Sequence, residues 1–212
     1  MNQDFNFWDY PVAAFIFAVT ILMSWVAFKN RRKAHEWMLN PYSVVHGKKY
    51  LSVLSSGFIH GDIAHLAFNM VSYYFFAFPL EQIMVAYIGP IGHLFFGLIY
   101  ILSIILANIP SVFQHKDHPS YNSLGASGAI TAVLFSFILF EPATKISMMF
   151  IPIGLPAPIF AILYIAFSIY ASKKMRGNIN HEAHISGAFA GLILSVLLFP
   201  GIIRHFISAV GY

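Results

Sequence analysis

The chain has 212 residues, of which 58% are hydrophobic, 17% are aromatic and only 9% are charged. This composition excludes an ordinary soluble domain, in which about 25% of residues are charged, and it predicts a protein of membrane-spanning helices. The formal net charge is +4, but the basic residues stand in short clusters beside apolar segments. Such clusters favour a role in membrane orientation over nucleic-acid binding. Cysteine is absent, which excludes disulfides, thiolate metal ligands and a cysteine nucleophile.

Residues 1–10 form a short polar N-terminal segment that holds acidic residues but no Lys or Arg. Because signal peptides begin with a basic region, we expect the first apolar segment to be retained as a membrane span. The rest of the chain shows no internal repeat, low-complexity tract or linker. We therefore predict a single transmembrane domain over residues 11–212.

Six apolar segments follow, and most of them approach the roughly 17 to 25 residues that a helix needs to cross a bilayer. They cover residues 11–28, 63–78, 86–109, 127–140, 146–172 and 184–206. The fold class predicted is an all-α polytopic membrane protein, a bundle of six transmembrane helices. The loops after the second and fourth segments are tight, while the other three are longer and polar, so the longer loops should share one side of the membrane.

Capping and breaking residues suggest where some of these helices begin and end. Asp62 offers an N-cap acceptor just before the second segment, and Pro79 is expected to end that helix. The fifth segment carries Pro152, Pro156 and Pro158, which deprive the backbone of hydrogen-bond donors. We expect a break or distortion of the helix there.

Several polar residues lie at membrane depth, where a polar side chain is costly unless it faces the interior of the bundle. On the second segment, His65 and Asn69 are four residues apart and share a helix face. The fourth segment opens with Ser127, which Gly125 and Gly128 flank. These residues are functional candidates.

His184 opens the sixth segment, and Gly187 and Gly191 follow it on the same face. Small residues four apart allow another helix to approach closely. If this face meets the small residues that open the fourth segment, Ser127 and His184 come within hydrogen-bonding distance. That pairing is the geometry of a serine nucleophile and its general base.

Acyl transfer by such a pair also needs donors around the developing oxyanion. The side chains of His65 and Asn69 and the backbone N–H of Ser127 can supply them, and Gly125 is expected to let a substrate backbone approach. Glu182 lies at a loop edge on a different helix face from His184, so a dyad is favoured over a triad. Each feature also has a structural interpretation: Ser127 as a helix cap, His184 as an interfacial residue, and His65 with Asn69 as interhelical hydrogen-bonding groups.

Together these residues closely resemble the motifs of the rhomboid family of intramembrane serine proteases. The motifs are His60-x4-His65-x3-Asn69, Gly125-Ala-Ser-Gly128 and Ala183-His184-x2-Gly187-x3-Gly191. The resemblance covers the chain from about Tyr50 onwards. It implies a six-helix core that cleaves membrane-anchored proteins, with Ser127 as nucleophile, His184 as base, and His65, Asn69 and the Ser127 amide as oxyanion donors.

The resemblance also implies that no cofactor and no metal is needed, and that transmembrane protein substrates enter laterally from the lipid bilayer near the second and fifth segments. The expected location is multi-pass in a bacterial cell membrane. Two positions depart from the family pattern. Thr131 stands where many rhomboids carry an aromatic residue that stacks on the histidine, and Lys48-Lys-Tyr-Leu-Ser52 replaces a Trp-Arg pair in the first loop.

The orientation in the membrane is open at this stage. Ten of the twelve Lys and Arg residues lie in or beside the three longer loops, which the positive-inside rule assigns to the cytoplasm together with Ser127. Typical bacterial rhomboids imply the opposite arrangement, in which the site opens to the outside.

Three other functions are weighed against the protease. One is a catalytically inactive rhomboid-like membrane protein that binds clients, although such relatives usually lack the serine or the histidine. Another is a metal enzyme that uses His60, His65, His181 and His184, but the His181-Glu-Ala-His184 spacing is not the HExxH pattern of zinc proteases. A transporter is disfavoured because the spans show no paired charges and no inverted repeat.

Overall fold

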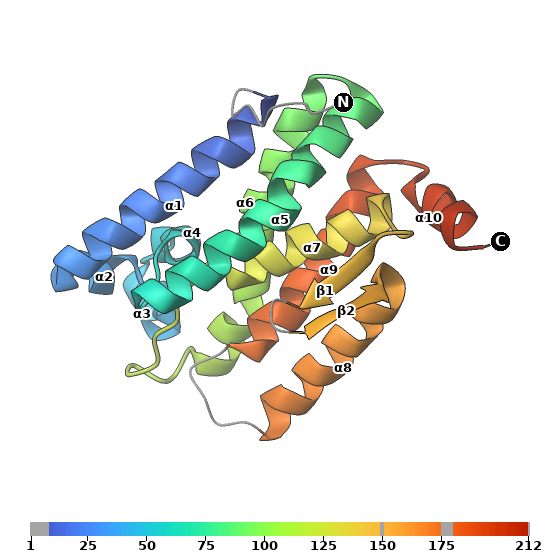
Figure 1. Ribbon diagram of the computed structural model, residues 1–212. Coiled ribbons are helices and arrows are strands. Elements are labelled where there is room, and N and C mark those ends of the chain that lie inside the picture. The colour runs from blue at the N-terminus through green and yellow to red at the C-terminus, as the bar shows by residue number, and fades with distance from the viewer. Residues whose placement is uncertain (1–8, 149–150, 175–179, 212) are drawn as a thin grey trace.

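The computed structural model describes residues 9–148, 151–174 and 180–211, and their fold is mostly helical (Figure 1). In chain order the helices are α1 (Pro11–Lys29), α2 (Arg31–Trp37), α3 (Pro41–Gly47), α4 (Leu51–Ser55), the 3-10 turn η2 (Ser56–Phe58), α5 (Ile63–Ile88), α6 (Ile91–His115), α7 (Ser127–Phe140), α8 (Ala157–Lys174), α9 (His181–Leu198) and α10 (Ile202–Val210). The strands β1 (Lys145–Met148) and β2 (Ile151–Pro156) form an antiparallel hairpin between α7 and α8.

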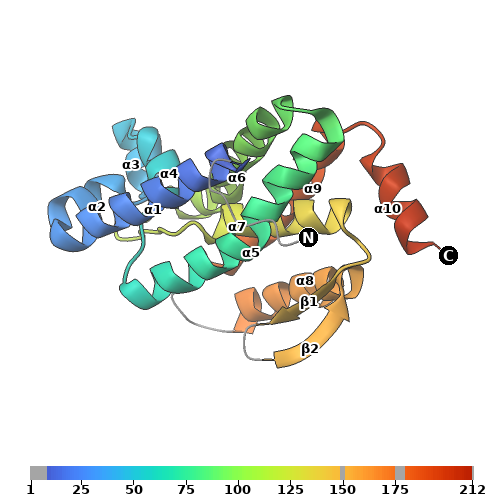
Figure 2. The ribbon, with the colours of Figure 1, turned by 45° about the horizontal axis from the view of Figure 1, so that its top comes forward.

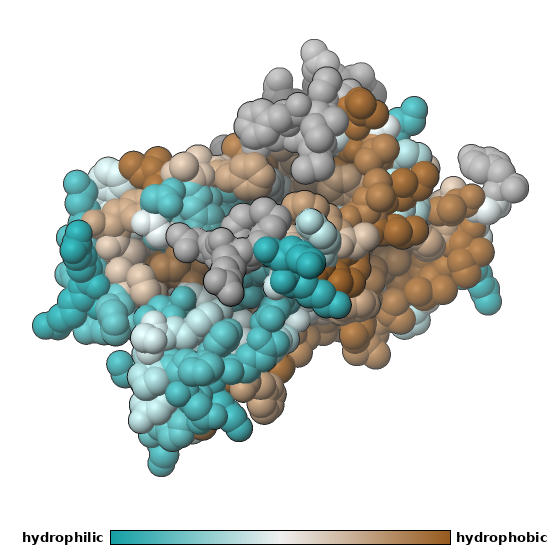
Figure 3. Space-filling model, turned by 90° about the horizontal axis from the view of Figure 1, so that it is seen from below, coloured by the Kyte–Doolittle hydropathy of each residue, from teal (hydrophilic) through white to brown (hydrophobic). Residues whose placement is uncertain are grey.

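Within the described part of the chain, α1, α5, α6 and α9 are long and apolar enough to cross a membrane, and α7 is a shorter apolar helix. The chain is therefore a multi-pass membrane protein. Viewed from below, the hydrophilic residues gather toward one end of the molecule and the apolar residues toward the other (Figure 3). This segregation is what a bilayer requires of a bundle whose polar loops emerge on one side.

Helix α7 is the centre of the bundle and has the predicted bounds, residues 127–140. Every one of its residues after Ser127 is buried. A helix that is apolar on all sides needs neighbours on all sides, and α5, α6, α8 and α9 pack around it. Helix α1 lies on one flank of α7, and α8 with the hairpin lies on the other (Figures 1 and 2).

The prediction that Pro79 ends the second helix is wrong, because α5 continues through Pro79 to Ile88. Transmembrane helices tolerate an internal proline where neighbouring groups satisfy the freed carbonyl. The helix stops at Gly89, which has a φ of 75°, and Pro90 follows it. The tight connection therefore lies ten residues later than expected, and Glu81, assigned to a loop by the sequence, lies inside the helix and is fully buried.

The fifth segment is divided, as its prolines predicted, but its first part is not helical. The hairpin pairs Lys145 with Pro156, and α8 begins only at Ala157, whose N–H donates to the Thr144 carbonyl at 2.9 Å. Pro158 then occupies the first turn of α8, where a missing N–H costs nothing. The prediction of an all-α fold is therefore corrected: the described residues also contain one two-stranded sheet.

The sixth segment is also divided, because α9 ends at Leu198 and a separate helix, α10, begins at Ile202. Between them Pro200 cannot continue the helix, and Gly201 adopts a φ of 102°. At the start of α5 the Asp62 cap is confirmed, since its side chain accepts from the His65 N–H at 2.8 Å.

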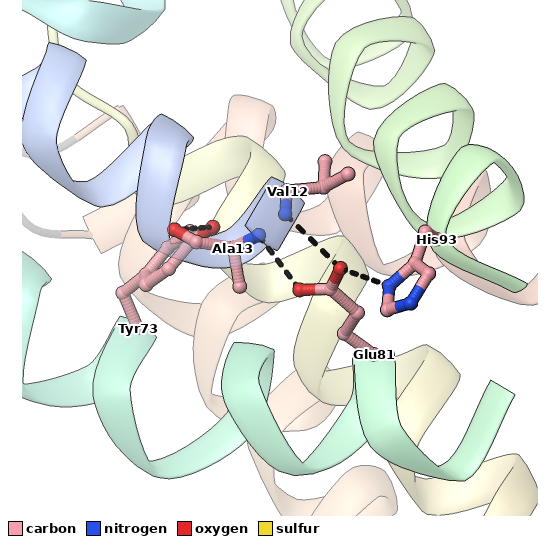
Figure 4. Close-up of polar contacts among 5 residues, drawn as sticks. All are labelled: Val12, Ala13, Tyr73, Glu81 and His93. Atoms are coloured by element: carbon pink, nitrogen blue, oxygen red, sulfur yellow. Dashed lines mark hydrogen bonds and ion pairs between the residues drawn. The ribbon is translucent and has the colours of Figure 1, made fainter. Parts of the chain in front are cut away.

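The buried carboxylate of Glu81, on α5, contacts both α1 and α6 (Figure 4). It accepts from the backbone N–H groups of Val12 at 3.1 Å and Ala13 at 2.7 Å, in the first turn of α1. The Nδ1 atom of His93, on α6, lies 2.6 Å from the same carboxylate. Because the first N–H groups of a helix have no partner within it and carry partial positive charge, a carboxylate suits this position. Tyr73 adds a hydrogen bond of 3.1 Å to the Ala13 carbonyl.

We expect Glu81→Gln to lower the free energy of unfolding by about 1–3 kcal/mol, because a Gln amide would present an NH₂ group to a helix N–H or to His93. The control is Glu36→Gln, which removes an exposed i,i+4 ion pair with Arg32; such pairs are worth about 0–1 kcal/mol. Thermal unfolding in detergent measures both. Equal losses in the two variants would contradict the role of Glu81.

Candidate active site

Ser127 and His184 come together at the polar-loop end of the bundle. Ser127 is the first residue of α7, and His184 lies in the first turn of α9. The Oγ atom of Ser127 is 2.8 Å from Nε2 of His184. The predicted proximity of the two side chains is confirmed.

The close approach of α7 and α9 explains this contact. A Cβ atom placed on Gly187 would overlap the carbonyl of Gly128, and one on Gly191 would overlap the carbonyl of Ala132. Ser136 on α7 also donates to the Gly191 carbonyl at 3.2 Å. The glycine face of α9 therefore lies directly on the backbone of α7, as the small-residue pattern predicted.

Gly128 lies in close contact with two neighbouring helices, α6 and α9. A Cβ atom there would lie 2.7 Å from the Ala107 Cβ of α6 and 3.3 Å from the Ala183 carbonyl of α9. The residue therefore allows α6 and α9 to approach the start of α7 from two sides.

Asn180 fixes the start of α9 and was missed by sequence reasoning. Its side chain accepts from the Ala183 N–H at 3.0 Å as an N-cap, and its amide donates to the Ser111 hydroxyl at 2.8 Å. An asparagine three residues before Ala183 is a recognisable cap signal. The cap holds the turn that carries His184.

The first loop supports the segment that precedes Ser127. Leu39 and Ser123 exchange two backbone hydrogen bonds of 2.9 Å. The Asn40 amide donates to the carbonyls of Pro119 and Tyr121, both at 2.9 Å. These contacts order the approach to the Gly125-Ala-Ser-Gly128 turn.

His65 lies against this turn. Gly125 has a φ of 124°, a conformation that favours glycine, and a Cβ atom there would lie 3.0 Å from Cε1 of the His65 ring. The sequence assigned the space beside Gly125 to a substrate backbone. In this structure the His65 ring occupies it.

Asn69 is buried one turn further along α5, and its amide donates to the His65 carbonyl at 3.0 Å. Ser127, as the first residue of α7, has a backbone N–H without a partner inside the helix. The three candidate oxyanion donors thus differ in placement: the Ser127 amide belongs to the turn, the His65 ring lies against the turn at Gly125, and the Asn69 amide donates within its own helix.

His60 links the turn to α1 through its two ring nitrogens. Its Nε2 accepts from the Ala126 N–H at 3.4 Å, and its Nδ1 lies 2.9 Å from the Ser24 hydroxyl on α1. Burial, reinforced by the neighbouring His65, lowers the pKa of His60 to about 3, so the ring is neutral at pH 7. Both ring nitrogens are engaged in these contacts, which disfavours His60 as a metal ligand.

The partner of His184 comes from α8. Tyr164 lies with its hydroxyl 3.3 Å from Nδ1 of His184 and its ring nearly parallel to the imidazole, at a centroid distance of 6.4 Å and an angle of 27°. The same hydroxyl is 3.0 Å from Oγ1 of Thr131. Thr131 indicated that an aromatic partner was missing from α7, but no motif pointed to Tyr164.

A small cavity of about 20 Å³ opens beside Ser127. Among its lining residues are the polar side chains of Asn108, Ser123 and Asn180. A polar cavity of this size has room for one water molecule, which would lie next to the serine.

The chain matches the model of the Rhomboid domain over residues 47–201. The match covers most of the chain and includes every motif residue discussed above. The chain belongs to the rhomboid family.

Its relatives include a bacterial protein and two proteins that are named mitochondrial. It is 31% identical to the protein named "Putative rhomboid protease YdcA" of Bacillus subtilis (strain 168), over 89% of this chain and 88% of the relative. It is 28% identical to RHOMBOID-like protein 12, mitochondrial, of Arabidopsis thaliana, over 82% of this chain and 53% of the relative. It is 27% identical to Rhomboid protein 1, mitochondrial, of Saccharomyces cerevisiae, over 82% and 49%. The chain thus spans about half the length of the two mitochondrial relatives.

We expect Gly187→Ala to lower the free energy of unfolding by about 1–3 kcal/mol, because the added methyl group meets a backbone carbonyl that cannot move away alone. Gly97→Ala on α6 is the matched control, since its methyl group would meet the Cγ1 atom of Val12, the end of a side chain that can shift. Thermal unfolding in detergent compares the two. An equal effect would contradict the close packing of α7 and α9.

Proposed function

We propose that this rhomboid family member is an intramembrane serine endopeptidase that hydrolyses peptide bonds in membrane-anchored proteins. The observation that carries the proposal is the 2.8 Å contact between Ser127 Oγ and His184 Nε2 at the start of a buried helix. A hydroxyl paired with an imidazole in a water-poor bundle is suited to acyl transfer.

In the proposed reaction, His184 Nε2 takes the proton of Ser127 as Oγ attacks the scissile carbonyl carbon. The imidazolium then gives that proton to the leaving amine, and an ester between Ser127 and the acyl half of the substrate forms. Water, activated by the same histidine, hydrolyses this ester and restores the serine. The steps need no metal and no cofactor.

The tetrahedral intermediates place negative charge on the former carbonyl oxygen. The Ser127 N–H, at the positive end of the α7 dipole, and the His65 ring, which lies against Gly125, can stabilise that charge. Asn69 joins them if its amide turns from the His65 carbonyl toward the substrate. We assign these three groups to the oxyanion site, with His60, Gly125, Gly128, Gly187 and Gly191 as their structural support.

The membrane arrangement follows from the same proposal. We propose that α7 and α8 span the membrane beside the four long apolar helices, which would make residues 11–212 one domain of six spans. The proposed partners are transmembrane protein substrates and the lipid bilayer. The Bacillus relative, which matches along most of both chains, supports a bacterial cell membrane as the location. The polar segment proposed for residues 1–10 lies mostly outside the described residues.

We expect Ser127→Ala and His184→Ala each to lower kcat for a model transmembrane substrate by about 10³-fold or more, because each removes half of the proton-transfer pair. Ser72→Ala and His205→Ala are the controls: Ser72 donates to a carbonyl on its own helix, α5, and His205 contacts the Phe140 carbonyl. The measurement is the rate at which each purified variant cleaves the model substrate in liposomes. Cleavage that persists in Ser127→Ala would refute the serine mechanism.

We expect Asn69→Ala to lower kcat by about ten- to a thousandfold with little change in thermal stability, as loss of one oxyanion donor should. The hydrogen bond that it loses in the resting structure lies within α5. Steady-state kinetics and a melting curve on the same preparation separate the two effects. An unchanged kcat would remove Asn69 from the mechanism.

A further inference from the structure

Four hydrogen bonds join Ser127, His184, Tyr164 and Thr131 into a closed ring. Ser127 Oγ lies 2.8 Å from His184 Nε2, and His184 Nδ1 lies 3.3 Å from the Tyr164 hydroxyl. That hydroxyl lies 3.0 Å from Thr131 Oγ1, and Thr131 Oγ1 donates to the Ser127 carbonyl at 2.8 Å. The ring therefore begins at the side chain of Ser127 and ends at its backbone.

The directions of these hydrogen bonds are fixed by counting protons. The Ser127 carbonyl can only accept, so the single proton of Thr131 goes to it. Thr131 Oγ1 must then accept from Tyr164, whose single proton is thereby used. The Tyr164 oxygen can serve His184 only as an acceptor.

The consequence falls on the histidine. Because Tyr164 accepts, the Nδ1 atom of His184 carries the proton, and Nε2 is left with a free lone pair toward Ser127. This is the tautomer that a general base needs. In a serine protease triad a carboxylate makes this selection from the Nδ1 side, whereas here two neutral hydroxyl groups stand in that place.

We propose that Thr131 and Tyr164 are positioning residues that together select the base-competent tautomer of His184, an inference that rests on the proposed protease function. Tyr164 touches the histidine, but Thr131 decides which way the Tyr164 proton points. Without the Thr131 hydroxyl, Tyr164 is free to donate to Nδ1, and Nε2 then carries the proton and can no longer accept one from Ser127.

The proposal predicts that substitutions of Thr131 and Tyr164 lower kcat to different extents, which a role in packing alone does not predict. Thr131→Val leaves a tyrosine that can stabilise the wrong tautomer, whereas Tyr164→Phe only removes the preference. We therefore expect kcat to fall about tenfold or more in Thr131→Val, the scale of one hydrogen bond of about 1.5 kcal/mol. Tyr164→Phe should lose less, and the double variant should be no worse than Thr131→Val.

The experiment compares these variants in detergent with Thr131→Ser, which keeps the hydroxyl, and Thr20→Val as a control. Thr20 is buried and donates to the Ile16 carbonyl at 2.8 Å on its own helix, α1, as Thr131 does to Ser127 on α7. We expect Thr131→Ser and Thr20→Val to keep kcat within about threefold of the unchanged protein, and KM to stay constant throughout.

A second measurement does not depend on cleavage. In protein labelled with ¹⁵N-histidine, the ring nitrogen shifts report the tautomer of His184, which His184→Gln assigns by the loss of its signals. The expected result is a proton on Nδ1 in the unchanged protein and in Thr131→Ser, and a shift toward Nε2 in Thr131→Val. An Nδ1 proton retained in Thr131→Val, or equal losses of kcat in Thr131→Val and Thr131→Ser, would overturn the inference. Absence of cleavage in the unchanged protein would refute the protease while leaving the tautomer measurement decisive.

Discussion

The structure depends on the direct contact between the backbones of α7 and α9. Gly187 and Gly191 lie against the carbonyls of Gly128 and Ala132, so the helices meet without side chains between them. In lipid, where burial of apolar surface drives helix association only weakly, such close packing is a main source of attraction. It also sets distance: with the axes this near, residues at the two helix starts, Ser127 and His184, fall within one hydrogen bond of each other. The packing that stabilises the bundle therefore also sets the distance between the two proposed catalytic residues.

Around that contact, two buried polar side chains, Glu81 and His60, hydrogen-bond to other helices. Glu81 joins α5 to the start of α1 and to His93 on α6. His60 joins α1, through Ser24, to the turn before α7. Because an unsatisfied polar group in the membrane costs several kcal/mol, these pairs also select one arrangement of the helices. Each connects sequence positions more than ten residues apart, so each fixes tertiary structure.

The sequence could predict what local patterns determine. The bounds of α7, the Asp62 cap and the meeting of the glycine face with the start of α7 follow from periodicity and residue size. Prediction from the sequence failed where tertiary packing determines the local structure. Pro79 lies inside α5, and the helix ends only at Gly89, whose positive φ turns the chain. Residues 145–148 and 151–156 pair as a hairpin, although nearly all of them belong to the apolar segment predicted over 146–172, since a short apolar run does not distinguish strand from helix. Tyr164 could not be found, because only the fold places α8 beside His184.

The origin of Tyr164 has a consequence for the proposed reaction. An aromatic residue at position 131 would hold the histidine from α7, whose residues beyond Ser127 are all buried. The small side chain of Thr131 instead admits a partner from α8, on which Ala157, Phe160, Ser168 and Ala171 are the buried residues and Phe167 and Tyr170 are more than half exposed. The support of the base thus comes from a helix at the edge of the bundle. The hydrogen bond that selects the tautomer of His184 in the proposed reaction therefore depends on how α8 packs against α7 and α9.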